Sequence, residues 1–447
     1  MNKNLFLFSL LILLSCCSFD SKTGIWGDGE KEKKIISELE KKQKQIIDTD
    51  KVYSSENIFL KEITLNKNIK FSKTKKNLFW KMSSLNHQNS LGNIYLSGTD
   101  NIFLKKKIGK NKFPMSMVMS SPLVLENFIV LSDDTGTIYK IDQSGRIYWK
   151  KNIYKKIYKK IYKNLVFSIY KNNVYVADNV GFIYSIDLQD GKLIWIKNHG
   201  IPLKSNIKVF KDKIFLINQD NRIICLNIKD GSKIWDIRAI SSFIKSQNFL
   251  SIAVTNEEDI VFINSAGDLI KTNLNYAQVH WSVNTSGSML AHATDFFKSS
   301  NIVIFNNDLI ISSQSSIFSY DVPTGFLNWE QEVSSVGSPI VDGNNIFIVT
   351  ENGYFVIIDK KSGDIISSNY ILKVLKKKKR ATEITGFIMG SGKIYSVTLN
   401  GYLIVSSGIT GKVENFKKIG DQIVSPPVIS DGKLYILTKK SRIIGFN

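Results

Sequence analysis

The sequence predicts an all-β fold: an eight-bladed β-propeller of four-stranded antiparallel blades. The first observation is a recurring motif, clearest at Phe182–Trp195, where a short strand ends in Asp, a turn contains Gly and a second strand closes on Trp. Variants of this motif end at Trp149, Trp235, Trp281 and Trp329, so successive tryptophans lie 46, 40, 46 and 48 residues apart. A repeat of about 40 to 50 residues is typical of propellers and solenoids.

The second observation is that tight turns divide each repeat into short strands rich in β-branched and aromatic residues. Gly, Asn and Asp recur at these turns because the primed turns of β-hairpins need positive φ, which these residues adopt at low cost. Examples of the two sets of turns are Asp342–Asn345, Ser391-Gly392 and Asp431-Gly432, and Thr135-Gly136, Asn352-Gly353 and Asn400-Gly401. The turns therefore predict four antiparallel strands per repeat.

The third observation is the count of repeats. Seven complete blades begin near Ser121, Phe167, Asn206, Ser251, Asn301, Ser338 and Thr385. An eighth begins at Ser425 and reaches Asn447 with only three strands, whereas Asp100–Ile108 is a strand without a blade of its own. We therefore expect the N- and C-terminal strands to share one blade, which closes the ring of residues 71–447 and removes exposed sheet edges.

The first fifteen residues have the pattern of a secretion signal. A lysine precedes Leu5–Leu14, an apolar stretch that is too short to span a bilayer. The sequence Leu13-Leu14-Ser15-Cys16 resembles the lipobox of bacterial lipoproteins, so residues 1–15 are predicted to be a lipoprotein signal peptide and Cys16 the lipidated residue. Two alternatives stay open: acylation of Cys17, and an ordinary signal peptide without lipid.

Residues 16–70 are predicted to be a lipidated tether, and acyl chains on Cys16 would hold the following domain at a membrane surface. In bacterial lipoproteins an Asp directly after the acylated Cys favours retention in the inner membrane. Here Cys17 follows instead. We therefore expect a lipid-anchored protein on the periplasmic face of the outer membrane.

The net charge of +21 does not by itself indicate nucleic-acid binding. Lysine is spread along the whole chain together with abundant Asn and Ile, and no nucleic-acid motif accompanies it. Attraction to an acidic membrane surface or to an acidic partner is a more ordinary explanation of such a charge. The two most basic stretches, Lys151–Lys163 and Lys376–Arg380, are predicted to be solvated, membrane-near or partner-facing loops, the first alternatively an extended outer strand.

No constellation of residues indicates catalysis. The four histidines lie in different repeats without metal-ligand spacing, and Cys225 lies within an apolar strand. Gly390–Lys393 imitates a phosphate-binding loop, but Ile394 occupies the position that needs Ser or Thr. The sequence therefore predicts a protein without catalytic residues, cofactor or metal, and hence not an enzyme.

The repeats resemble those named after pyrroloquinoline quinone enzymes, and the segment before the first blade resembles the BamB family of outer-membrane assembly lipoproteins. In that family a Trp precedes a Gly/Asn/His-rich stretch, and "LSG" then leads into a first strand that ends in Ile-Gly. Trp80, His87-Gln88-Asn89, Leu96-Ser97-Gly98 and Ile108-Gly109 stand in those places. The sixth and seventh repeats depart from the pattern, since Ile366 and Phe416 fall near the expected Trp.

The resemblance implies a non-enzymatic scaffold, monomeric within its complex, that binds a BamA-type barrel-assembly subunit through loops between central blades. The matching loops are residues 239–248 and 286–298. Phe243, Ile244 and Lys245 take the place of an apolar–apolar–basic contact, and Asp295 that of an acidic one. Alternatively, Phe243 and Ile244 fill the space between two blades.

Two other functions stay open at this stage. The first is a propeller that binds another envelope protein or a carbohydrate. The second is a quinone-dependent dehydrogenase, an enzyme class that resembles this chain in its repeats. Those enzymes usually carry a vicinal Cys pair within the domain, whereas the adjacent cysteines here are Cys16 and Cys17 in the leader.

Overall fold

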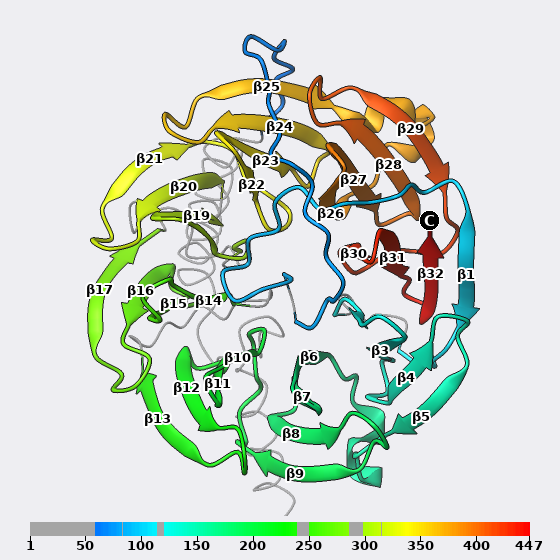
Figure 1. Cartoon of the computed structure of the whole chain (residues 1–447), viewed down its shortest axis with the longest axis vertical. Helices are drawn as coiled ribbons and strands as arrows, with labels where there is room; N and C mark the ends of the chain where they lie inside the picture. Colours follow the sequence, from blue (N-terminus) through cyan, green and yellow to red (C-terminus); the bar gives the residue numbers. More distant parts are fainter. Residues whose placement is uncertain (1–58, 83, 114–119, 239–249, 286–297, 314) are drawn as a thin grey trace, which may run out of the picture. The chain divides into compact units, whose positions relative to one another are not determined.

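The computed structural model describes residues 59–447 except 83, 114–119, 239–249, 286–297 and 314. All of the described residues belong to one compact unit, Phe59–Asn447. Eight four-stranded antiparallel sheets form a ring in this unit (Figure 1). The predicted all-β, eight-bladed propeller is confirmed.

Each of the first four blades is formed by four consecutive strands. Blade 1 contains β2 (Leu123–Val124), β3 (Phe128–Ser132), β4 (Ile138–Asp142) and β5 (Ile147–Lys151). Blade 2 contains β6 (Leu165–Tyr170), β7 (Asn173–Asp178), β8 (Phe182–Asp187) and β9 (Leu193–Asn198). Blade 3 contains β10 (Lys208–Phe210), β11 (Lys213–Ile217), β12 (Arg222–Asn227) and β13 (Lys233–Arg238). Blade 4 contains β14 (Ile252–Val254), β15 (Ile260–Ile263), β16 (Asp268–Thr272) and β17 (Val279–Asn284).

The next three blades repeat this order, and the last blade joins the two ends of the ring. Blade 5 contains β18 (Val303–Phe305), β19 (Asp308–Ser313), β20 (Ser316–Asp321) and β21 (Leu327–Gln331). Blade 6 contains β22 (Ile340–Asp342), β23 (Asn345–Val349), β24 (Tyr354–Asp359) and β25 (Ile365–Tyr370). Blade 7 contains β26 (Ile384–Gly390), β27 (Lys393–Thr398), β28 (Tyr402–Ser407) and β29 (Val413–Lys418). Blade 8 contains β30 (Val428–Ser430), β31 (Lys433–Leu437), β32 (Arg442–Phe446) and β1 (Ile102–Lys107).

The ring closes as the count of repeats predicts. β1 pairs antiparallel with β32, and Lys105 lies opposite Ile444. Since β1 is the outer strand of blade 8, the two ends of the propeller are joined by backbone hydrogen bonds. β1 covers the edge of β32, which would otherwise be an exposed sheet edge in blade 8.

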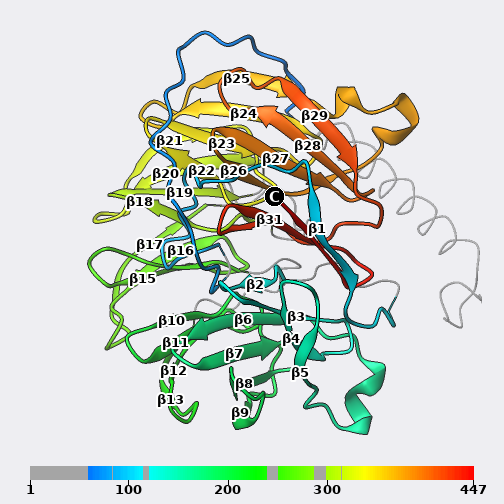
Figure 2. The same cartoon turned by 45° about the vertical axis from the view of Figure 1, so that its right-hand side comes forward.

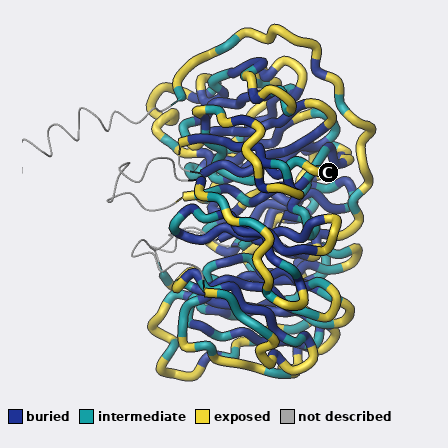
Figure 3. Tube along the Cα trace, turned by 90° about the vertical axis from the view of Figure 1, so that its left-hand side faces the viewer, coloured by how far each residue is buried: buried dark blue, intermediate teal, exposed yellow. Residues whose placement is uncertain are grey.

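Burial explains why the strand sequences differ across a blade. The third strand of blade 2, β8, is buried along its four central residues, whereas the outer strand β9 is exposed except for Trp195. Figure 3 shows the same division, with dark blue inner strands beneath yellow outer strands and turns. The inner strands are therefore continuous apolar runs, as expected for strands covered on both faces by neighbouring blades.

The blades give the ring two different faces. The turns that join first to second and third to fourth strands lie together on one face, where Leu188 N–H donates to Asn172 O in blade 2. The turns between second and third strands and the connections between blades lie on the other, where the side chain of Asn179 donates to Tyr162 O. We name these the hairpin face and the loop face.

The tryptophans of the repeat hold neighbouring blades together. Each indole N–H donates to a backbone carbonyl of the next blade, at 2.9–3.2 Å: Trp149 to Leu188, Trp195 to Ile228, Trp235 to Leu274, Trp281 to Val322 and Trp329 to Lys360. The motif therefore marks a joint between blades.

Polar side chains replace Trp at the joint between blades 6 and 7 and at the joint between blades 7 and 8. The register places Ser367 and Asn415 at the Trp position of blades 6 and 7, one residue from Ile366 and Phe416. Between blades 6 and 7, Asn369 donates to Thr410 O at 3.4 Å. Between blades 7 and 8, Lys417 donates to the carbonyl of Thr99.

One pair of substitutions tests this joint. Gly231 has φ +68°, and a Cβ there would lie 2.6 Å from the Trp195 ring, whereas Ala277 holds the same place beside Trp235 with φ +61°. Because a side chain disfavours positive φ, Gly231→Ala should lower the free energy of unfolding by about 2 kcal/mol, and Ala277→Gly should raise it by up to about 1 kcal/mol. Urea denaturation measures both changes. Shifts of the same sign would contradict this explanation.

Candidate interaction sites

The first described residues run along the outer strand of blade 6 before the chain enters the centre of the ring. Phe59 O accepts from the side chain of Asn352 on the loop face, and Ile63 bridges to Ser368 in β25. The chain reaches the hairpin face at Lys67, which pairs with Asp359 at 2.5 Å. In Figure 1 the blue trace begins outside β25 and then enters the middle of the ring.

Residues 80–97, here named the central insert, contact all eight blades within the described part of the chain. The bonds to blades 1, 2, 4, 5, 7 and 8 include backbone ones: Trp80 with Val124, Lys81 with Ile169, His87 with Val254, Gln88 with Ile304, Ile94 with Ser391 and Ser97 with Gly432. Side chains reach blades 3 and 6, through His87 to Val209 O and through Ser84 to Ser338. The insert therefore fastens the inner ends of the blades to one another.

The most buried polar contacts of the insert surround Asn89. Its amide donates to Ile252 O at 3.0 Å and to Ile302 O at 2.7 Å. Its carbonyl oxygen accepts from the ammonium of Lys208 at 2.5 Å, and Lys208 also donates to Asn86 O at 2.7 Å. One amide side chain thus joins blades 3, 4 and 5.

Burial governs the protonation of this cluster. It lowers the pKa of Lys208 to about 7, because burial removes the ammonium from water and no carboxylate of the described residues compensates this cost. The pKa of His87 is also lowered by burial, with a further contribution from the charge of Lys208. His87 Nε2 lies 2.7 Å from Val209 O, so this nitrogen carries the proton of the neutral ring.

The sequence identified part of this site. Trp80, His87-Gln88-Asn89 and Leu96-Ser97 were singled out by resemblance, and the structure brings them together in the insert. Lys208 was missed, although a lysine within the apolar stretch Ile207–Val209 is itself a signal of a buried polar contact.

The predicted partner-binding residues lie outside the described residues. Phe243, Ile244 and Lys245 fall in the connection between β13 and β14, and Asp295 falls between β17 and β18. Both connections join the outer strand of one blade to the first strand of the next. Cys16, Cys17 and residues 1–58 are also outside the described residues, so lipidation stays a prediction.

Other sequence expectations have a definite outcome. Cys225 is fully buried, and burial raises the pKa of its thiol to about 12, which is consistent with a small apolar core residue. Gly390 ends β26 and Lys393 begins β27, so the imitation of a phosphate loop is a β-hairpin turn. Within the described residues, no helix has the length and apolar character needed to cross a membrane.

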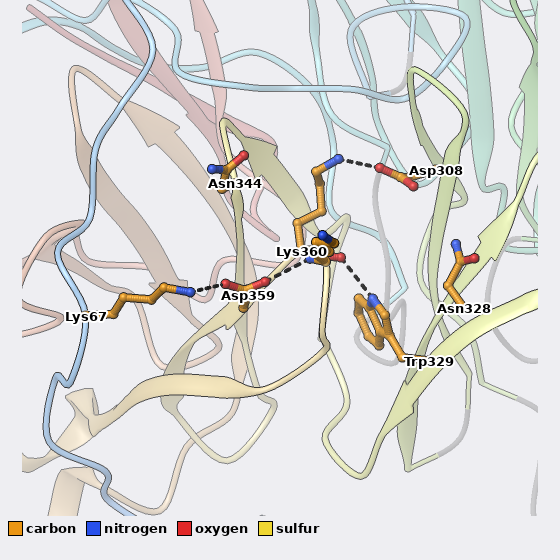
Figure 4. Close-up of a pocket in the computed structure, with 8 residues that line it drawn as sticks. Lys67, Asp308, Asn328, Trp329, Asn344, Asp359 and Lys360 are labelled. Carbon is orange, nitrogen blue, oxygen red and sulfur yellow. Dashed lines mark hydrogen bonds and ion pairs between the residues drawn. The ribbon is translucent and has the colours of Figure 1, made fainter.

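A polar cavity of roughly 670 Å³ lies between blades 5 and 6 and is lined by Lys67, Asp308, Asn328, Trp329, Asn344, Asp359, Lys360 and Lys361. Figure 4 shows that its charged groups face one another. Lys67 pairs with Asp359 and lowers the pKa of that carboxyl, and Lys360 pairs with Asp308. Because these charges satisfy each other, the cavity forms part of the joint between blades. Among the described residues, no group of three His, Cys, Asp or Glu side chains is placed to hold a metal ion.

The fold and the repeat define the class: an eight-bladed propeller built from pyrroloquinoline-quinone-type repeats. The family model described as "Outer membrane protein assembly factor BamB" matches residues 104–202 and 134–369, more than half of the chain. The chain belongs to the BamB family.

Two relatives illustrate the distance within the family, and both are described as outer membrane protein assembly factor BamB. The protein from Moranella endobia is 22% identical over 272 residues, which are 59% of this chain and 67% of the relative. The protein from Escherichia coli is 21% identical over 335 residues, 63% of this chain and 83% of the relative.

Solved structures support the same fold. BamB from Moraxella catarrhalis superposes with a TM-score of 0.62 at 11% identity and covers 77% of this chain and 100% of its own. A europium-containing methanol dehydrogenase superposes with a TM-score of 0.63 at 12% identity, over 81% of this chain and 89% of its own. At such identities the superpositions establish the fold and leave the function to other evidence.

Proposed function

We propose that this protein is a non-enzymatic scaffold lipoprotein of the outer-membrane β-barrel assembly machine. The observation that carries the proposal is membership of the BamB family across most of the propeller. In this proposal acyl chains on Cys16 anchor the chain to the periplasmic face of the outer membrane. Phe243, Ile244, Lys245 and Asp295 contact the BamA-type subunit.

The centre of the ring supports a scaffold rather than a quinone enzyme. The central insert contributes backbone groups, two asparagines and a histidine there, and Lys208 lies beneath it. These residues do not fit an acidic site for a calcium or lanthanide ion, since the described part of the chain contains no suitable cluster of carboxylates. The insert instead stiffens the ring, a useful property in a scaffold whose loops must hold fixed positions.

Purification of the tagged full chain from its own envelope in mild detergent tests the proposal. The BamA-type subunit should co-purify with the chain. Phe243→Asp combined with Lys245→Glu should abolish recovery, because it removes an apolar anchor and reverses a charge.

The matched control is Phe326→Asp with Lys361→Glu. These exposed residues lie in turns of the hairpin face, and their replacement should leave recovery unchanged. Failure of the BamA-type subunit to co-purify with the folded, unsubstituted chain would contradict the proposal.

A further inference from the structure

Two basic protrusions lie on the loop face. The connection from β5 to β6, residues 152–164, contains five lysines and no acidic residue, and its middle forms a 3-10 turn, Lys156–Lys160. The connection from β25 to β26 carries Lys376–Arg380, of which Lys377–Lys379 form another 3-10 turn. In Figure 2 the teal turn after β5 and the orange turn after β25 project on the same side of the ring.

The first protrusion is held in place by its own ends. Tyr154 and Lys163 bracket the turn and are both buried, with 7% and 2% of their surface exposed. The Tyr154 hydroxyl donates to Asp178, and the ammonium of Lys163 lies 4.7 Å from the centre of the Tyr154 ring. Lys163 also donates to the carbonyls of Tyr158 and Ile161. The contacts of Tyr154 and Lys163 therefore fix the turn in one position as it projects from the ring.

This projection exposes apolar side chains among its charges. Ile157 is 76% exposed and Ile161 is 46% exposed. Lys155, Lys156, Lys159 and Lys160 surround them and are exposed as well. Residues 152–164 contain no Asp or Glu, so none of these four lysines has a carboxylate partner within its own connection. Large aliphatic side chains with lysines beside them suit the boundary between lipid headgroups and acyl chains.

The start of the propeller chain lies on the same face. Phe59 bonds to Asn352 and Leu60 to Tyr354, at the turn between the second and third strands of blade 6. Glu62 pairs with Lys373 at 2.7 Å, just before the second protrusion. Phe59, the first described residue, therefore lies on the same face as the two protrusions.

We propose that the loop face is a membrane-docking surface, in which the turn at Lys156–Lys160 inserts Ile157 into an anionic lipid surface and both lysine clusters bind its headgroups. This contact is independent of an acyl chain and goes beyond the scaffold function. The exposed isoleucines favour a membrane over an acidic protein as the partner. An isoleucine that projects alone among lysines is removed from water when it enters the acyl chains of a lipid layer, without the need for a matching apolar pocket.

The test is flotation of the folded chain, without its predicted signal peptide and with Cys16→Ser and Cys17→Ser, with lipid vesicles. Vesicles of phosphatidylcholine containing about a third phosphatidylglycerol should bind the chain at low salt, and pure phosphatidylcholine vesicles should not. Lys156→Gln, Lys159→Gln and Lys160→Gln together should weaken binding on the order of 100-fold. Ile157→Asn should weaken it about 10-fold.

The hairpin face supplies matched controls. Lys229→Gln, Lys361→Gln and Lys412→Gln remove the same charge from exposed turn residues, and Phe326→Asn removes a side chain that is 74% exposed. Both should leave vesicle binding within about 2-fold of the parent chain. Equal losses in the control and loop-face variants would overturn the proposal, and so would absence of binding to anionic vesicles.

Soluble polyglutamate separates a membrane from an acidic protein. Displacement of the chain from vesicles by polyglutamate, with binding that does not depend on Ile157, would assign the surface to an acidic protein and overturn the membrane proposal. Failure of these vesicle experiments would leave co-purification of the BamA-type subunit unaffected, so the two proposals fail separately.

Discussion

Asn89→Ala is expected to lower the free energy of unfolding by about 3 to 4 kcal/mol. The substitution leaves the carbonyls of Ile252 and Ile302 without their donor and removes an acceptor from the fully buried Lys208. Unsatisfied buried groups cost about 1 to 3 kcal/mol each, and a buried charge costs more. The central insert should also become sensitive to limited proteolysis, because these bonds hold it to blades 3, 4 and 5.

A double-mutant cycle distinguishes this explanation from simple loss of packing. Lys208→Met removes the buried charge and keeps much of the side-chain volume, so Asn89→Ala should cost at least about 1 kcal/mol less in the Lys208→Met background. Denaturation with urea at pH 7 measures all four proteins. Strict additivity, or a loss below about 0.5 kcal/mol for Asn89→Ala alone, would contradict the assigned role of this cluster.

The same lysine should make stability depend on pH. Its pKa is about 7 in the folded protein and has the ordinary value of 10.5 when unfolded, so the unfolded state binds more protons between these values. Stability therefore rises with pH across that window, and below it Lys208 adds no pH dependence because it is protonated in both states. From pH 7 to pH 9 the parent chain should gain about 2 kcal/mol relative to Lys208→Met. An equal slope in both proteins would show that Lys208 keeps its ordinary pKa in the folded protein, and would contradict this explanation.

Local signals account for the success of the fold prediction. Turn residues such as Gly231 and joint residues such as Trp195 act on neighbours in the sequence or in the next blade, so their spacing reports the blade directly. Closure by β1 and β32 followed from counting strands. A departure such as Ala277 does not disturb the count, because a single residue at positive φ costs only about 1 to 2 kcal/mol.

The interaction sites were less predictable, for a physical reason. The sequence of the central insert does not repeat along the chain. Its hydrogen-bond partners are backbone groups far away in the sequence, such as Ile302 O for Asn89. Resemblance identified His87-Gln88-Asn89 without indicating that they lie at the centre of the ring. For Lys151–Lys163 the sequence allowed either a protruding loop or an extended outer strand. The structure shows a loop, because β5 ends at Lys151 and a 3-10 turn follows at Lys156–Lys160.

The most direct test of the scaffold function is site-specific photocrosslinking in the native envelope. A photoreactive phenylalanine analogue replaces Phe243 in one version of the full chain and Phe326, in a turn of the hairpin face, in another. Our account predicts a covalent adduct with the BamA-type subunit from position 243 and none from position 326. No adduct from 243 in a folded, envelope-associated chain, or equal adducts from both positions, would contradict it.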